Sequence, residues 1–206
     1  MNAASLAEFA LLSVVIEVTP GPNMTYLAVI AATEGRRRGY AAVLGVCLGL
    51  AVIGLAAAFG LAVVISGNPA AYQALKWAGV AYLLWLAWDG WRGADEAVQH
   101  AEAGSSVAKF FRRGLITNLL NPKAALFYVS VLPGFVDGSG AVQGGILAQT
   151  LVLTGIYVAI ATAIHAGIVT AAGAARRLLE EPARERLARR GLALVLVGVA
   201  VWFALG

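Results

Sequence analysis

Six long apolar runs constrain this chain more than any other feature of its sequence. They cover roughly residues 6–33, 40–66, 71–91, 114–136, 145–172 and 190–206. A helix needs about 20 mostly apolar residues to cross the hydrocarbon core of a bilayer. Five of the runs reach that length and the last is slightly shorter. We therefore predict an all-α membrane protein with six transmembrane helices.

The composition agrees with a bilayer environment. Hydrophobic residues make up 60% of the 206 positions and charged residues only 13%, whereas a soluble domain carries about 25% charged residues. Too few polar side chains are present to cover the apolar surface in water, so lipid has to surround the chain.

Lysine and arginine are distributed unevenly between the apolar runs. Three lie between the first and second runs, four between the third and fourth, and six between the fifth and sixth, which makes 13 of the 15. Short basic loops remain in the cytoplasm. We therefore predict a multi-pass protein of the inner membrane with both termini outside. The net charge of +4 then reflects topology and contacts with membrane lipids, and not a nucleic-acid partner.

The longest polar connection, residues 92–113, divides the six runs into three and three. It predicts a three-helix half at 1–91, a cytoplasmic linker, and a second three-helix half at 114–206 within one membrane domain. Because each half has an odd number of spans, the two halves would have opposite orientations. We treat this 3+3 inverted repeat as a hypothesis.

Prolines interrupt the first and fourth runs, in TPGPN at 19–23 and NLLNPK at 118–123. A proline inside a helix costs about 3 kcal/mol because it removes a hydrogen bond and clashes with the preceding turn. A carbonyl freed in this way within hydrocarbon must face protein or a wet cavity. Asn121 before Pro122 is typical of a helix start, and Gly21 before Pro22 or Thr19 before Pro20 is equivalent in the first run. We predict broken first and fourth helices.

Paired interrupted helices at matching positions of two halves indicate a transporter's binding site. Their restarted segments would both direct positive N-terminal ends toward the midplane, which suits a substrate carboxylate. The alternative is that the prolines only kink packed helices.

The stretches TPGPNM at 19–24 and NLLNPKAALF at 118–127 resemble the LysE/RhtB family of amino-acid exporters, the threonine/homoserine/lysine-type translocators. The resemblance extends over nearly the whole chain, in its length and in its six apolar segments. It implies efflux of amino acids or their derivatives from the bacterial cytoplasm across the cell membrane, driven by the proton gradient. The family's substrates vary, so the resemblance does not name the cargo.

Glu17 and Lys123 are charged residues at membrane depth, where insertion of such a side chain costs about 2.5–3.5 kcal/mol. Glu17 is a candidate to bind a substrate ammonium group or to carry a coupled proton. Lys123 is a candidate to meet a substrate carboxylate. The alternative for Glu17 is a structural partner to Lys123 or to an amide across the bundle. The alternative for Lys123 is a snorkelling or paired structural lysine.

The candidate residues for substrate binding or coupling are polar groups and helix breakers near the two interruptions: Glu17, Thr19, Pro20, Gly21, Pro22, Asn23, Asn118, Asn121, Pro122 and Lys123. For the asparagines at the breaks, helix capping is an equal alternative. Tyr128 is a further candidate. His165 is a candidate proton relay, or else a bundle residue with satisfied hydrogen bonds.

Gly45 and Gly49 form a G-x-x-x-G stretch in the second run. Such a stretch packs helices closely, either within one subunit or at the seam of a homo-oligomer.

The sequence argues against an enzyme, a metal site and a cofactor. It has no cluster of metal-ligating residues, no serine in a nucleophile motif, and no G-x-x-x-x-G-K-[ST] loop for ATP. We therefore assign no catalytic residue. Export of another small solute or ion, or a role as a non-transporting assembly subunit, remains the alternative to amino-acid export.

Overall fold

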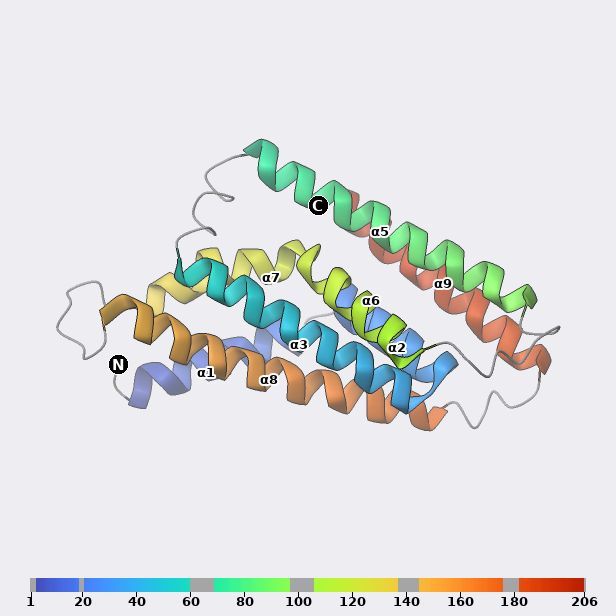
Figure 1. Cartoon of the computed structure of the whole chain (residues 1–206), viewed down its shortest axis with the longest axis horizontal. Helices are drawn as coiled ribbons and strands as arrows, with labels where there is room; N and C mark the ends of the chain where they lie inside the picture. Colours follow the sequence, from blue (N-terminus) through green and yellow to red (C-terminus); the bar gives the residue numbers. More distant parts are fainter. Residues whose placement is uncertain are drawn as a thin grey trace.

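The computed structural model describes residues 3–18, 21–59, 69–96, 106–136, 145–175 and 182–205, and every regular element in these ranges is helical (Figure 1). The elements are α1 (Ala3–Val18), α2 (Pro22–Glu34), α3 (Arg36–Ala58), α5 (Pro69–Glu96), α6 (Val107–Leu119), α7 (Pro122–Leu126), the π-helix η1 (Phe127–Val131), the 3-10 helix η2 (Leu132–Phe135), α8 (Gly145–Ala175) and α9 (Pro182–Leu205). The prediction of an all-α protein is confirmed.

Both predicted helix breaks are present. The first apolar run forms α1 and α2, inclined by 59° to each other, and α2 begins at Pro22 with Gly21 as its N-cap. The fourth run is interrupted between α6 and α7. There Pro122 is the first helical residue, and the Asn121 side chain accepts a hydrogen bond of 3.1 Å from the Lys123 N–H. Proline tolerates this first position because its missing N–H has no helical partner there.

By length and hydropathy, α3 and α8 are each able to cross a membrane, and α1 with α2 makes a third span if counted as one. The other three predicted spans do not pass this test within the described residues. The segment from α6 to η2 is divided into short pieces, and the first half of α9 carries several arginines. Helix α5 continues to Glu96 and α6 begins at Val107, so both extend into the predicted linker. The arrangement of six spans stays a prediction.

Helix α3 lies at the centre of the bundle and packs against α6 and α8. Helix α8 also packs against α1 and α2, whereas α5 and α9 pair with each other along one side (Figure 1). Glycine at position 35 has φ of 89° and joins α2 directly to α3, a conformation that favours glycine. The joined ends of α2 and α3 lie at the same end of the molecule as the start of α6 and the end of α8.

The contact between α3 and α6 is made by backbones. A Cβ atom added to Gly45 would overlap the Phe111 carbonyl oxygen, and one added to Gly114 would overlap the Ala42 carbonyl oxygen. The small residues therefore let the two helices approach closely. Of the two interpretations of the G-x-x-x-G stretch, the structure supports close packing of helices within a single subunit.

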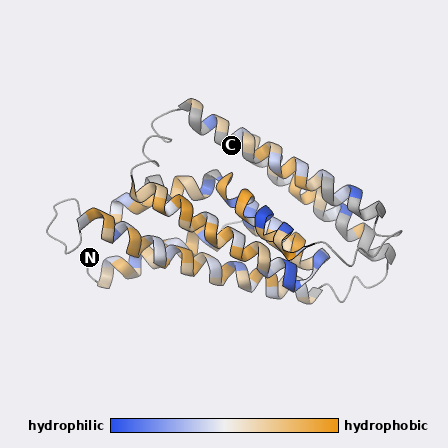
Figure 2. Cartoon of the chain, viewed as in Figure 1, coloured by the Kyte–Doolittle hydropathy of each residue, from blue (hydrophilic) through white to orange (hydrophobic). Residues whose placement is uncertain are grey.

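Large apolar side chains cover much of the outer surface. Leu11, Leu44, Trp88 and Leu194 are each at least 60% exposed, and apolar residues run along the lengths of α3 and α8 (Figure 2). Hydrophilic residues gather where α3 and α6 begin. Extended exposed apolar surface of this kind is suited to lipid.

The α3–α6 contact predicts that Gly45→Ala destabilises the protein by about 1–3 kcal/mol, because the new methyl group has no space against a carbonyl. Thermal unfolding in detergent would measure the change. Gly155→Ala on α8 is the matched control, since a Cβ there meets nothing within 4 Å. Equal melting temperatures for the two variants would contradict the close contact.

Candidate functional site

Glu17 lies on the inward face of α1. Phe9, Ser13 and Glu17 are the buried residues of that helix, and their spacing of four places them on one face. Ser13 donates a hydrogen bond to the Phe9 carbonyl, so its hydroxyl is satisfied locally. The Glu17 carboxylate is not satisfied within its own helix and depends on side chains from elsewhere in the bundle.

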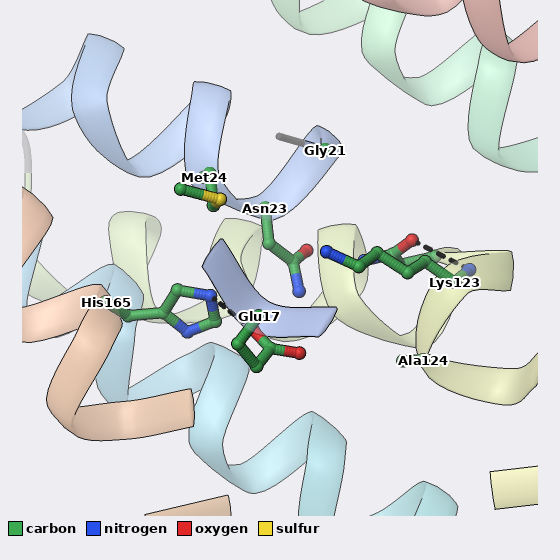
Figure 3. Close-up of a pocket in the computed structure, with 8 residues that line it drawn as sticks. Glu17, Gly21, Asn23, Met24, Lys123, Ala124 and His165 are labelled. Carbon is green, nitrogen blue, oxygen red and sulfur yellow. Dashed lines mark hydrogen bonds and ion pairs between the residues drawn. The ribbon is translucent and has the colours of Figure 1, made fainter. Parts of the chain in front are cut away.

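Two side chains of α8 supply those groups. The Tyr157 hydroxyl donates a hydrogen bond of 2.5 Å to Glu17 Oε1, and His165 Nε2 lies 3.2 Å from Glu17 Oε2 (Figure 3). Tyr157 and His165 are eight residues apart, so they lie on the same face of α8 two turns from each other. The Glu17 carboxylate therefore joins both turns to α1. His165 Nδ1 is buried and has no hydrogen-bond partner among the described residues.

The ring of Tyr157 is held by a second broken segment. It stacks on Phe127 of η1 with 3.7 Å between ring centroids and meets the edge of Tyr128 at 5.5 Å. Tyr128 itself donates to the Leu50 carbonyl of α3. These contacts fix the hydroxyl that reaches Glu17.

An amide pair joins the two interrupted segments. Asn23 Nδ2 in the first turn of α2 donates a hydrogen bond of 2.7 Å to Asn118 Oδ1 near the end of α6. Both residues are buried, and Asn23 Oδ1 and Asn118 Nδ2 have no partner among the described residues. Gly49 of α3 makes room for this pair, since a Cβ there would approach Asn118 Nδ2 to 2.7 Å. The pair leaves one acceptor and one donor without a partner.

Lys123 extends from the start of α7 toward Asn23 and Glu17 (Figure 3). Its ammonium group and the Glu17 carboxylate are close enough to interact electrostatically. The start of α7 is capped by Asn121, whereas the N-cap of α2 is Gly21, which has no side chain for this role. Among the described residues no side chain accepts from the first-turn N–H groups of α2, so another acceptor can bind there.

These groups surround a small pocket. It is lined by Glu17, Gly21, Asn23, Met24, Asn121, Lys123, Ala124 and His165, and its volume is about 10 Å³ (Figure 3). This is room for roughly one water molecule. A carboxylate, an ammonium group, an imidazole and an amide all reach this space, so groups of both charges meet there.

The structure brings together most of the residues that were predicted from the sequence. Glu17, Gly21, Asn23, Asn121, Lys123 and His165 line the pocket, and Asn118 touches it through Asn23. Pro22 and Pro122 begin the two restarted helices. Tyr128 supports the site through Tyr157 but is not part of the lining. Thr19 and Pro20 lie outside the described residues.

The chain matches the sequence signature described as LysE type translocator over residues 14–206. It belongs to the LysE family of translocators. The match covers almost the whole sequence and includes both interrupted segments, so the resemblance of the two motifs to this family is confirmed.

Several relatives of this LysE-family chain have names that state an activity. A leucine efflux protein of an Enterobacter species is 35% identical over 145 residues, which are 67% of this chain and 68% of that protein. A homoserine/homoserine lactone efflux protein of Salmonella typhimurium is 30% identical over 165 residues, 80% of this chain and 78% of that protein.

An uncharacterised membrane protein of Pseudomonas aeruginosa is 36% identical over 137 residues, which are 64% of this chain and 63% of that protein. The match thus spans slightly less than two thirds of that relative. No solved structure matches this LysE-family chain.

Met24 and Ala124 are the lining residues that sequence reasoning missed. It also missed Tyr157, which bonds Glu17 but does not line the pocket. Met24 belongs to the TPGPNM stretch that supported the family resemblance. Its position next to Asn23 could have identified it as a candidate site residue. Tyr157 lies in a uniformly apolar helix, where nothing in the sequence marks it as a partner of Glu17.

The bond from Tyr157 predicts that Tyr157→Phe destabilises this LysE-family chain by about 1–3 kcal/mol. The change leaves a buried carboxylate oxygen without its donor and keeps the stacked ring. Tyr40→Phe is the control because the Tyr40 hydroxyl bonds Thr170 at an exposed position, and we expect it to stay within about 0.5 kcal/mol. Thermal unfolding of both variants in detergent checks this, and an unaffected Tyr157→Phe protein would contradict the bond.

Proposed function

We propose that this chain is a secondary transporter that exports amino acids or amino-acid derivatives from the bacterial cytoplasm in exchange for protons. The observation that carries the proposal is the buried carboxylate of Glu17, which faces a pocket together with Lys123 and the start of α2. The names of the leucine and homoserine efflux relatives support the substrate class.

The pocket has a partner for each charged end of an amino acid. An α-ammonium group would donate to Glu17 and to Asn23 Oδ1, which has no partner within the described ranges. An α-carboxylate would accept from Lys123 and from the first-turn N–H groups of α2, where the helix dipole favours negative charge. The two ends of the substrate thus contact both interrupted segments at once.

Exchange of substrate for protons is expected because both would bind to the same carboxylate, that of Glu17. A proton and a substrate ammonium group are both cations that Glu17 can hold, and one carboxylate holds only one of them tightly. Substrate arriving from the cytoplasm would displace the proton, and a proton arriving from outside would replace the departing substrate. His165, whose Nδ1 has no hydrogen-bond partner in the described part of the chain, is placed to pass the proton on.

Several helix contacts have the pairing expected of a 3+3 inverted repeat. Exchanging the halves would pair α3 with α8, α5 with α9, and α1–α2 with α6–η2. Under this exchange, the contact of α3 with α6 corresponds to the contact of α8 with α1 and α2. The α3–α8 and α5–α9 contacts each correspond to themselves, because the exchange only swaps the two helices of the pair. All of these contacts are present.

The small pocket would have to widen to hold a substrate, because an amino acid is several times larger than the single water molecule that fits. Transport would require one half to rock against the other around the two interruptions, opening the pocket to each side in turn.

Export predicts that Glu17→Gln lowers efflux at least about tenfold, because the amide can neither take up a proton nor neutralise an ammonium group. The measurement is amino-acid accumulation outside bacteria that express the chain and are fed dipeptides, at matched membrane abundance. Unchanged amino-acid pools with the native chain would point to another solute or to an assembly role.

Glu8→Gln is the matched control for this experiment. Glu8 lies on the same helix but is exposed, so its neutralisation should leave efflux unchanged. Equal efflux by the native chain and Glu17→Gln would return Glu17 to a structural role.

The proposed orientation places both termini outside and the start of α3 in the cytoplasm. In a Cys47→Ser background, we expect Glu8→Cys to react with an impermeant maleimide in intact spheroplasts. Arg37→Cys, which is also exposed, should react only in everted vesicles. The reverse pattern would invert the topology.

A further inference from the structure

The charges around the pocket balance without a substrate. Glu17 and Lys123 are the acidic and basic side chains of the described lining, and His165 is the remaining titratable group. With Glu17 ionised and Lys123 protonated, the lining has a net charge of zero when His165 is neutral. Protonation of His165 would make it more positive.

We propose that the substrates of this chain are amino acids with uncharged side chains, and that basic and acidic amino acids are excluded by charge. This inference rests on the proposed export function and narrows it. An α-ammonium group and an α-carboxylate together add no net charge, so a neutral amino acid leaves the buried site balanced. A basic side chain would bring an additional positive charge with no anion to meet it, at a large desolvation cost.

Glu34 and Glu8, the other carboxylates whose side chains the structure describes, do not supply that anion. Glu34 at the end of α2 is paired with Arg38 at 2.6 Å, and Glu8 is exposed near the start of α1. Neither lines the pocket. An acidic substrate is disfavoured for the corresponding reason, since Lys123 already balances Glu17.

Met24 and Ala124 provide the apolar part of the lining. Ala124 is buried, and Met24 is partly buried on the other interrupted segment. An unbranched thioether adapts to different apolar shapes. These two residues are therefore the surfaces against which an uncharged substrate side chain would pack, and we assign them as specificity-determining positions.

The test uses the purified full-length protein in proteoliposomes with a panel of neutral, basic and acidic amino acids. The panel includes homoserine and α,γ-diaminobutyrate, which share a carbon chain and differ in a terminal hydroxyl or ammonium group. We expect neutral amino acids to exchange at least about tenfold faster than charged ones of similar size.

Each outcome decides a different question. Transport of a basic or acidic amino acid as fast as the neutral ones would overturn the charge argument while export itself stands. If no amino acid is transported, the proposed function is wrong and this inference falls with it.

A gain-of-function variant tests the same charge balance directly. Met24→Glu adds an anion to the lining, and Met24→Gln has nearly the same shape without the charge. We expect the Glu variant to exchange α,γ-diaminobutyrate at least about tenfold faster than the Gln variant, with Ala124→Asp as a second variant if Met24→Glu does not fold. A folded Glu variant that still exports neutral substrates but gains no cationic one would contradict the proposal.

Discussion

The contact of Glu17 with Tyr157 and His165 is the interaction on which the arrangement of the site depends. A carboxylate far from water needs hydrogen-bond donors or a cation, since leaving it unpaired is more costly than the bonds are stabilising. Both partners come from α8, so α1 is held against α8 at one depth, one residue before it ends at Val18. The first-turn groups of α2 are thereby brought to the same depth.

Broken and continuous helices make different contributions around this anchor. The continuous α3 and α8 supply side chains at fixed separations and a surface on which the other segments pack. The broken segments supply helix starts, and with them backbone donors that a continuous helix would have consumed internally. The amide pair of Asn23 and Asn118 joins the two kinds of break, and Gly49 of α3 gives it space. Each part of the pocket is therefore positioned by a different helix.

Local chemistry explains which features could be predicted from the sequence. Pro22 and Pro122 act on their own turns, so the two breaks and the cap at Asn121 were predictable. Glu17 and His165 stood out because polar groups at membrane depth are costly. The partnership with Tyr157 was not predictable, since the face that a uniformly apolar helix presents to its neighbours has no periodic signal. The observed helix bounds differ from the predicted ones for a related reason. The charged turns at the start of α9 are helical, although they lie outside any apolar run.

The π-helix that follows α7 has a consequence for how the site can move. A π-turn contains one residue more than an α-turn, and such insertions are frequent at functional sites. If η1 relaxed to an α-helix, the extra residue would pass along the segment and rotate Phe127 away from its stacked position on Tyr157. The hydroxyl on Glu17 would lose its support while the segment remained helical. A change from π-helical to α-helical winding, without any unfolding, would thus weaken the support of the hydrogen bond to the Glu17 carboxylate.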